Sequence, residues 1–300
     1  MDTGQDKNER DEMVAKLEEA NKRIKELENK NKVLELDNLF RNDLIQIHKS
    51  SQNVGEKDEM IVIMQLFNHN RLKEYDKLVK IFGDGASEGV AIINTDTNEI
   101  ITDTKDIKKA GGNYKADISI QMNKTNMIYP TSIKSKNGAN AAILNHTPRT
   151  AKVFMPSGRL HKHLPSLDVL LHEYKYKRMN KQISEDVYLH TLDCIKYPAV
   201  LNGIKESISY FTFDGTGKGD SKSKANCILY YENDNILFIK CCDLEEKKKY
   251  VDSIISKCII SLRDKGMPKK ICEENKPWIF SDVKLDGTIK LKGSLHIRLK

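Results

Sequence analysis

The sequence predicts an α/β fold in which a mixed sheet flanked by helices follows an N-terminal coiled-coil helix. Two observations predict this fold: a long run without Gly or Pro near the start, and short β-like runs that alternate with helical stretches over the rest of the chain. Three hundred residues are enough to bury a large core. We expect a dimerisation helix over residues 1–45 and an α/β body over residues 50–300.

The first helix is predicted over residues 11–37, which are rich in strong helix formers. Asn31 is the one polar residue in a seam of a and d positions, where a single Asn favours a two-stranded pairing in one register. An amphipathic helix lying on its own domain is the alternative. The apolar residues of the seam alternate in steps of four and three: they are Met13, Leu17, Ala20, Ile24, Leu27 and Leu34.

The body is expected to begin with one helix over residues 56–82, which Gly83 and Gly85 end. A helix is also expected over 244–265, and a hairpin with Asp286 and Gly287 at its turn. At least two helices are predicted within 164–208. The β-like runs lie at 90–94, 99–103, 116–120, 127–134, 152–155, 209–215 and 225–242.

Composition limits the class of protein. Hydrophobic residues are 39% and charged residues 31% of the chain, and no stretch approaches the roughly 20 apolar residues that a membrane helix needs. The polar, acidic start lacks the features of a secretory signal, so we expect an intracellular protein of a prokaryotic or virus-infected cell, without a membrane partner. The six cysteines show no metal-binding spacing and are expected to be reduced, packed thiols.

Positive charge is concentrated in the middle of the chain. The formal net charge is +7, but residues 132–181 alone contain ten Lys or Arg against two acidic residues. A polyphosphate partner such as DNA favours this surplus, because each neutralised phosphate releases counterions. A solvated basic surface explains the charge equally well.

Two of the β-like runs carry chemically useful residues. If residues 115–120 and 128–134 form a hairpin, Asp117, Ser119, Ser132 and Lys134 can meet at one edge of the sheet, because side chains alternate between faces. A carboxylate that holds a divalent metal, beside a lysine that orients or deprotonates water, suits hydrolysis of a phosphodiester. Mg²⁺ is the expected metal, since it prefers a few carboxylate oxygens with water and phosphate.

The runs "KADISI" and "TSIKS" resemble the core of the PD-(D/E)XK nucleases, and the stretch up to residue 155 resembles type II restriction endonucleases of that superfamily. The resemblance implies a restriction-endonuclease-like sheet, with Asp117 as a metal-binding acid, Lys134 as the catalytic lysine and the carbonyl of Ile133 as a further metal ligand. Ser132, a further expected catalytic residue, departs from the family, which usually has Glu or Asp there, so either Ser132 holds a metal-bound water or another carboxylate substitutes. The family also has a glutamate on an upstream helix.

Glu88 is the expected replacement for the charge missing at Ser132, both as a catalytic residue and as a metal ligand, because it lies upstream of the strands. Asp84 and Glu74 are the alternatives. DNA contacts are expected from basic and amide side chains in the basic region and from a Gly-rich loop after it. These residues are Lys136, Asn145, Arg149, Arg159, Lys177, Arg178 and Lys218.

The resemblance implies a Mg²⁺-dependent, site-specific endonuclease for double-stranded DNA. Such an enzyme is expected to act as a homodimer on a short palindrome, because two-fold symmetry supplies one active site for each strand. A non-catalytic DNA-binding protein that retains the nuclease-like fold is the first alternative. A coiled-coil scaffold protein, in which the motif is coincidental, is the second.

Overall fold

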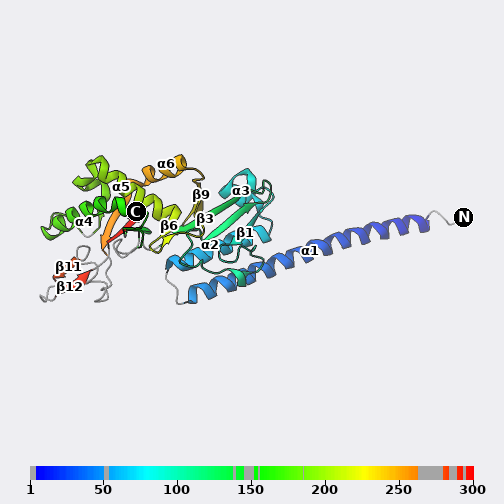
Figure 1. Ribbon diagram of the computed structural model, residues 1–300. Helices are drawn as coiled ribbons and strands as arrows, with labels where there is room; N and C mark the ends of the chain where they lie inside the picture. The colour runs from blue at the N-terminus through cyan, green and yellow to red at the C-terminus, as the bar shows by residue number, and fades with distance from the viewer. Residues whose placement is uncertain are drawn as a thin grey trace.

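The computed structural model describes most of the chain and gives a mixed α/β body with a long N-terminal helix (Figure 1). The helices are α1 (Gln5–Lys49), α2 (Val54–Arg71), α3 (Tyr75–Phe82), α4 (Leu164–Met179), α5 (Pro198–Ser209) and α6 (Leu244–Ile255). The described residues are 5–50, 54–137, 140–144, 152–154, 156–184, 186–262, 280–283, 289–292 and 295–300.

A five-stranded mixed sheet forms the centre of the body, in the order β1-β2-β3-β8-β9. All neighbouring pairs are antiparallel except β3 and β8, which are parallel and are joined by a connection that contains α4 and α5. Its strands are β1 (Val90–Asn94), β2 (Ile118–Met122), β3 (Ile128–Ser135), β8 (Cys227–Glu232) and β9 (Asn235–Lys240).

Smaller sheets complete the body. One has four strands in the order β4-β13-β10-β5, and β11 pairs with β12 and β6 with β7 in two-stranded sheets. The strands are β4 (Ala141–Leu144), β5 (Val187–Tyr188), β6 (Gly215–Thr216), β7 (Gly219–Asp220), β10 (Cys258–Leu262), β11 (Phe280–Val283), β12 (Ile289–Lys292) and β13 (Leu295–Leu299).

Helices cover both faces of the five-stranded sheet, as the sequence predicts. Strand β8 is buried on both sides, because its side chains alternate between two hydrophobic cores. Leu229 packs with α2 and α3 in one core, and Ile228 and Tyr230 pack with α4, α5 and α6 in the other. Strand β3 has the same alternation, with Ile133 in the first core and Ser132 and Lys134 on the opposite side.

Helix α1 extends away from the body for most of its length (Figure 1). Its last turns pack on α2: Ile47 is buried, and Phe40 and Leu44 lie against the same core. The guanidinium of Arg71 also donates to the carbonyl of Leu36 at 2.9 Å. The predicted N-terminal helix is confirmed and is longer than expected.

The predicted helix over 56–82 is divided in two. Lys73 has a φ of 56°, a left-handed conformation that a continuous α-helix does not accept, and α3 starts afresh at Tyr75. The run at 99–103 forms only a bridge between Ile100 and Ile93 rather than a strand.

Three further expectations are wrong. The segment 209–215 is not extended but continues from α5 into a π-helix at Tyr210–Asp214, whose three aromatic side chains pack in the core. The run at 152–155 contains a 3₁₀ turn at Lys152–Phe154. The last predicted helix ends at Ile255, and the apolar run after it is strand β10.

Several other expectations hold. Strands β11 and β12 pair as the expected hairpin, whose turn residues lie outside the described part. Cys242 is exposed, whereas the other four cysteines of the described residues are buried thiols. Among the described helices, none combines the length and the apolar character that crossing a membrane requires.

Candidate active site

The candidate site lies where β2 separates from β3. The ladder between these strands runs from Gln121↔Ile128 to Ile118↔Thr131, although β3 continues to Ser135. The N–H of Asp117 donates to the carbonyl of Thr131 at 2.8 Å, so two residues oppose Thr131, as in a β-bulge. The bulge places the Asp117 side chain beside the part of β3 that no longer pairs with β2.

Beyond the end of the β2–β3 ladder, the carboxylate of Asp117 accepts the hydrogen bonds of β3 that a residue of β2 would otherwise accept. Its Oδ2 accepts a hydrogen bond from the N–H of Ile133 at 2.6 Å and another from the hydroxyl of Ser132 at 3.2 Å. Its Oδ1 has no hydrogen-bond donor among the described residues. One oxygen is therefore held in place while the other is available to a ligand. The expectation that Asp117 and Ser132 meet is confirmed.

Glu59 on α2 is the second carboxylate of the site. Burial raises its pKa to about 8, the negative charge of Asp117 contributes in the same direction, and the charge of Lys134 opposes it. Helix α2 is held over the end of β3 by a hydrogen bond from the hydroxyl of Ser135 to the buried carboxylate of Asp58. Glu59 follows this anchor directly in the helix, and its carboxylate interacts electrostatically with Asp117 and Lys134.

Three lysines surround the two carboxylates. Burial, together with repulsion from Lys134, lowers the pKa of Lys115 to about 7, although the charges of Asp117 and Glu59 oppose this shift. Burial would also lower the pKa of Lys109, but its ion pair with Glu56 and the charges of Glu59 and Asp117 raise it instead. The site is therefore a partly desolvated cluster of carboxylates and ammonium groups that interact with one another.

No group of three or more His, Cys, Asp or Glu side chains in the described part is arranged to hold a metal ion, so Mg²⁺ would have to be held by two carboxylates together with water and phosphate. Glu59 and Asp117 supply two mutually repelling carboxylates. The N–H of Ile133 points towards Asp117, and its carbonyl shares that side of the strand. Mg²⁺ typically takes one or two carboxylates and leaves its other positions to water and phosphate.

Glu88 does not reach this site. It precedes β1, whose first residue Val90 pairs with Met122 at the end of β2, and Asp117 lies at the other end of that strand. Its carboxylate is near Lys124, which is also paired with Asp84 at 2.6 Å. The third carboxylate considered from the sequence, Glu74, binds His69 and Lys77. The structure thus brings Glu59, and none of the three expected residues, to Asp117.

A basic loop is attached directly to the segment that leads into Asp117. The carbonyl of Ser223 accepts hydrogen bonds from the N–H groups of Lys115 and Ala116 at 3.0 and 3.1 Å, and the N–H of Lys222 donates to the carbonyl of Asn113 at 3.2 Å. We call residues 216–224 the basic loop. Its three lysines are exposed: they are Lys218, Lys222 and Lys224.

The other expected DNA contacts are dispersed. Lys136 lies over the ring of Tyr230, and Arg159 is paired with Asp214 at 3.0 Å. Arg178 is at the end of α4, away from the bulge. Asn145 and Arg149 lie outside the described residues.

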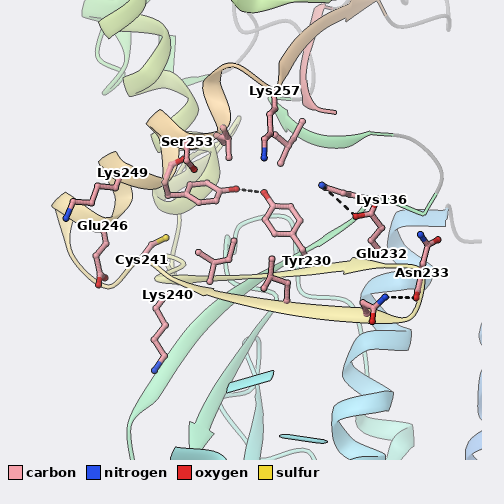
Figure 2. A pocket seen from close by; sticks show the side chains of 16 residues that line it. Lys136, Tyr230, Glu232, Asn233, Lys240, Cys241, Glu246, Lys249, Ser253 and Lys257 are labelled. Atoms are coloured by element: carbon pink, nitrogen blue, oxygen red, sulfur yellow. Dashed lines mark hydrogen bonds and ion pairs between the residues drawn. The ribbon is translucent and has the colours of Figure 1, made fainter. Parts of the chain in front are cut away.

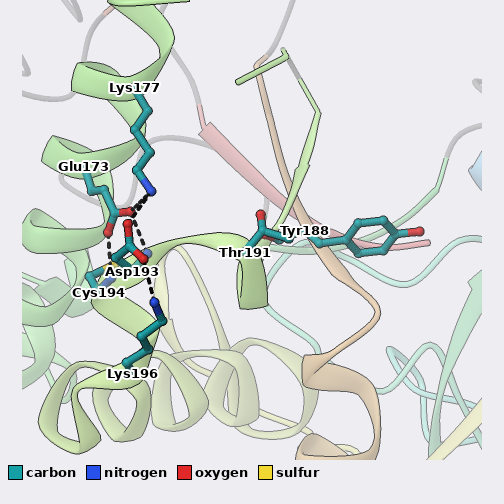
Figure 3. Close-up of polar contacts among 7 residues, drawn as sticks. All are labelled: Glu173, Lys177, Tyr188, Thr191, Asp193, Cys194 and Lys196. Carbon is teal, nitrogen blue, oxygen red and sulfur yellow. Dashed lines mark hydrogen bonds and ion pairs between the residues drawn. The ribbon is translucent and has the colours of Figure 1, made fainter. Parts of the chain in front are cut away.

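Lys177 belongs to an ion-pair network between α4 and the segment before α5 (Figure 3). It binds Glu173 at 2.8 Å and Asp193 at 2.7 Å. Burial would raise the pKa of Glu173, but hydrogen bonds from Lys177 and from the N–H groups of Asp193 and Cys194 lower it. This network joins α4 to the turn before α5, so Lys177 has a structural role.

A cavity of about 650 Å³ lies next to the site on the same face of the sheet (Figure 2). Lys134 pairs in register with Tyr230 on β8, and Tyr230 pairs with Leu237 on β9. The hydroxyl groups of Tyr230 and Tyr250 are hydrogen-bonded inside this cavity. Its lining contains both lysines and carboxylates: Lys136 and Lys257 lie there with Glu246 and with Glu232, which is 3.9 Å from Lys136.

Comparison of the chain with models of protein families, with curated proteins and with solved structures finds no match. The geometry of the site is therefore the basis for a functional proposal.

Proposed function

We propose that this protein is a metal-dependent, site-specific endonuclease that hydrolyses phosphodiester bonds of double-stranded DNA. The observation that carries the proposal is the electrostatic interaction of Glu59 with Asp117 and Lys134, beside the hydrogen bond that joins Asp117 to the strand carrying Lys134. These three residues come from a helix, from the start of a strand and from the next strand, in the order that the PD-(D/E)XK nucleases use. The restriction-endonuclease-like fold is part of the same proposal, supported by the mixed sheet flanked by helices.

Each residue has a chemical role in this proposal. Glu59, Asp117 and the Ile133 carbonyl would hold Mg²⁺, which when bound polarises the scissile phosphate and lowers the pKa of water. Ser132 orients the Asp117 carboxylate through its hydroxyl. Lys134 positions the attacking water and stabilises negative charge that develops on the phosphate. Lys115, with a pKa of about 7, can exchange a proton near neutral pH.

The basic loop and the Lys136 side of the cavity supply the phosphate contacts. Exposed lysines next to the bulge can follow the DNA backbone on either side of the scissile bond. This placement favours DNA over a small phosphodiester, because the positive charge extends beyond the catalytic cluster. Reading of the sequence would depend on side chains that reach base edges.

The test is a digest of plasmid and bacteriophage DNA with Mg²⁺, using the full chain and its Lys134→Ala variant. Discrete fragments from the parent that are absent with the variant support the proposal. A parent that shifts DNA on a gel but never cuts it is instead a DNA-binding protein, in which the serine at 132 marks loss of catalysis. Neither cutting nor binding would favour a coiled-coil scaffold protein.

A further inference from the structure

The outer part of α1 has an apolar seam that nothing in the described chain covers (Figure 1). Apolar side chains on a helix are normally buried, and a regular stripe of them at heptad spacing requires a partner helix. The exposed fractions in this seam are 71% for Met13, 62% for Leu17, 52% for Ile24, 54% for Leu27 and 60% for Leu34.

The seam ends where the helix reaches the body. After Leu34 the apolar residues that contact the protein are on a different stripe, which contains Phe40, Leu44 and Ile47 and packs against α2. The helix is continuous through this change. The docked turns therefore hold the helix on the body, while about 33 Å of seam from Met13 to Leu34 projects from it.

Charges beside the seam are segregated by heptad position. With Leu17, Ile24 and Asn31 at a, the three g positions between Met13 and Leu34 are all basic, and the e positions from residue 21 to residue 35 are polar or acidic. Val14 occupies the e position before them, and the next g residue, Asp37, is paired with Arg41. No ion pair within the described chain involves the last two charged residues of either set. The g residues are Lys16, Arg23 and Lys30, and the e residues are Asn21, Glu28 and Glu35.

This distribution of charges favours a second copy of the helix as the partner, in a parallel orientation. In a parallel coiled coil a g residue faces the e residue of the following heptad on the other helix, so a second copy would pair Arg23 with Glu28 and Lys30 with Glu35 on both sides of the seam. In an antiparallel pair of the same helices, g faces g and e faces e. Like charges would then meet at every such position.

We propose that α1 binds α1 of a second copy of this chain as a parallel, in-register, two-stranded coiled coil. Asn31 pairs with Asn31 of the second copy within the seam, which fixes the register. Because the docked turns follow the seam in the same helix, a parallel coil places both bodies at one end. Two catalytic clusters then lie beside each other, as cleavage of both strands of a duplex requires if the proposed nuclease activity holds.

Mass and crosslinking of the full chain test this arrangement without DNA. Light scattering should give twice the monomer mass of 34.3 kDa. A Leu17→Cys variant should form a disulfide-linked dimer on oxidation, since position 17 faces position 17 of the second copy in the in-register parallel coil. In an antiparallel coil centred on Ile24 the two copies of position 17 lie roughly 20 Å apart. The parent chain, oxidised under the same conditions, is the control for crosslinking through its exposed Cys242.

Charge reversal tests the pairing itself. Reversing the three g residues to Glu should raise the dimer dissociation constant about tenfold or more. A control with the same change in net charge on outward positions should change it less than twofold: Lys22→Glu, Lys25→Glu and Lys32→Glu. A monomeric parent, a dimer without the position-17 crosslink, or equal effects of the two triple variants would each overturn the proposal. None of these outcomes bears on DNA cleavage.

Discussion

Replacing Glu59 by Gln should abolish most activity while it stabilises the metal-free protein. The change keeps the size of the side chain and removes a carboxylate that faces Asp117 and Lys134. Loss of one carboxylate from a two-carboxylate metal site should lower the rate of DNA cleavage by about 10²-fold or more, since several kcal/mol of charge stabilisation depend on the metal. If Glu59 only supported the fold, its replacement by Gln would lower the stability of the metal-free protein.

The gain in stability follows from the pKa of Glu59, which is about 8 in the folded protein against an ordinary value of 4.5. The folded state binds this proton more tightly than the unfolded state, so the free energy of unfolding falls as pH rises between those values, by about 1.4 kcal/mol per pH unit. The ceiling is about 5 kcal/mol above pH 8, and relaxation of the partly exposed site reduces it to about 1–3 kcal/mol. Gln carries no such penalty.

Thermal unfolding in EDTA at pH 5 and pH 8.5 measures this difference. The parent and Glu59→Gln should unfold at similar temperatures at pH 5, and the variant should unfold about 2–10 °C higher at pH 8.5. Glu88→Gln is the matched control, because it makes the same chemical change at the other end of the sheet and should leave both cleavage and stability unchanged. Loss of cleavage with Glu88→Gln, or normal cleavage with Glu59→Gln, would refute the assignment of the site.

Three other variants test separate parts of the protein. Lys134→Ala should lower cleavage by about 10²- to 10⁴-fold and leave the affinity for DNA, measured by gel shift with Ca²⁺, within a few-fold; a loss of affinity alone would contradict a catalytic role. Changing the three lysines of the basic loop to Gln should weaken DNA binding and reduce the slope of log K against log salt by about 0.9 for each phosphate that the variant no longer neutralises, and an unchanged slope would exclude the loop from the interface. Glu173→Gln should lower the free energy of unfolding by about 1–3 kcal/mol at pH 7; because folding lowers the pKa of Glu173, the difference from the parent should shrink as the pH falls below about 4, and a difference that persists at pH 3 would contradict the ionic explanation.

Local patterns in the sequence predict the long helix, the Asp117 and Lys134 strands and the β11–β12 hairpin, because periodicity and turn residues determine each of them within a short window. Local sequence patterns do not identify Glu59 as a residue of the site. It lies within the first predicted helix of the body, but its proximity to Asp117 depends on how α2 crosses the end of β3, where Asp58 meets Ser135. Glu88 is nearer to Asp117 in the sequence and is separated from it by the whole length of a strand.

The π-helix at Tyr210–Asp214 is a second feature that the local sequence does not predict. Its aromatic and β-branched residues favour a strand by propensity, but Phe211 and Phe213 are buried in a core made by α4, α5 and α6. Tertiary packing therefore overrides the local preference. Lys115 was not identified for a related reason: its lowered pKa depends on burial and on Lys134, neither of which the segment around it reveals.

In the proposed nuclease, Ser132 stands where the PD-(D/E)XK nucleases usually have Glu or Asp, and its contacts offer a reason why a carboxylate is not needed there. Its hydroxyl donates to Asp117, whereas an acid would place a third negative charge beside a pair whose repulsion already contributes to the raised pKa of Glu59. Ser132→Asp should therefore lower cleavage at pH 7 by about tenfold or more, with partial recovery at higher Mg²⁺, and Ser132→Asn should cost less because it keeps a neutral donor. Faster cleavage by Ser132→Asp than by the parent would mean that Glu59 does not supply the missing charge. The site would then be a weakened form of the family's arrangement, rather than one in which the helix glutamate and Asp117 are sufficient.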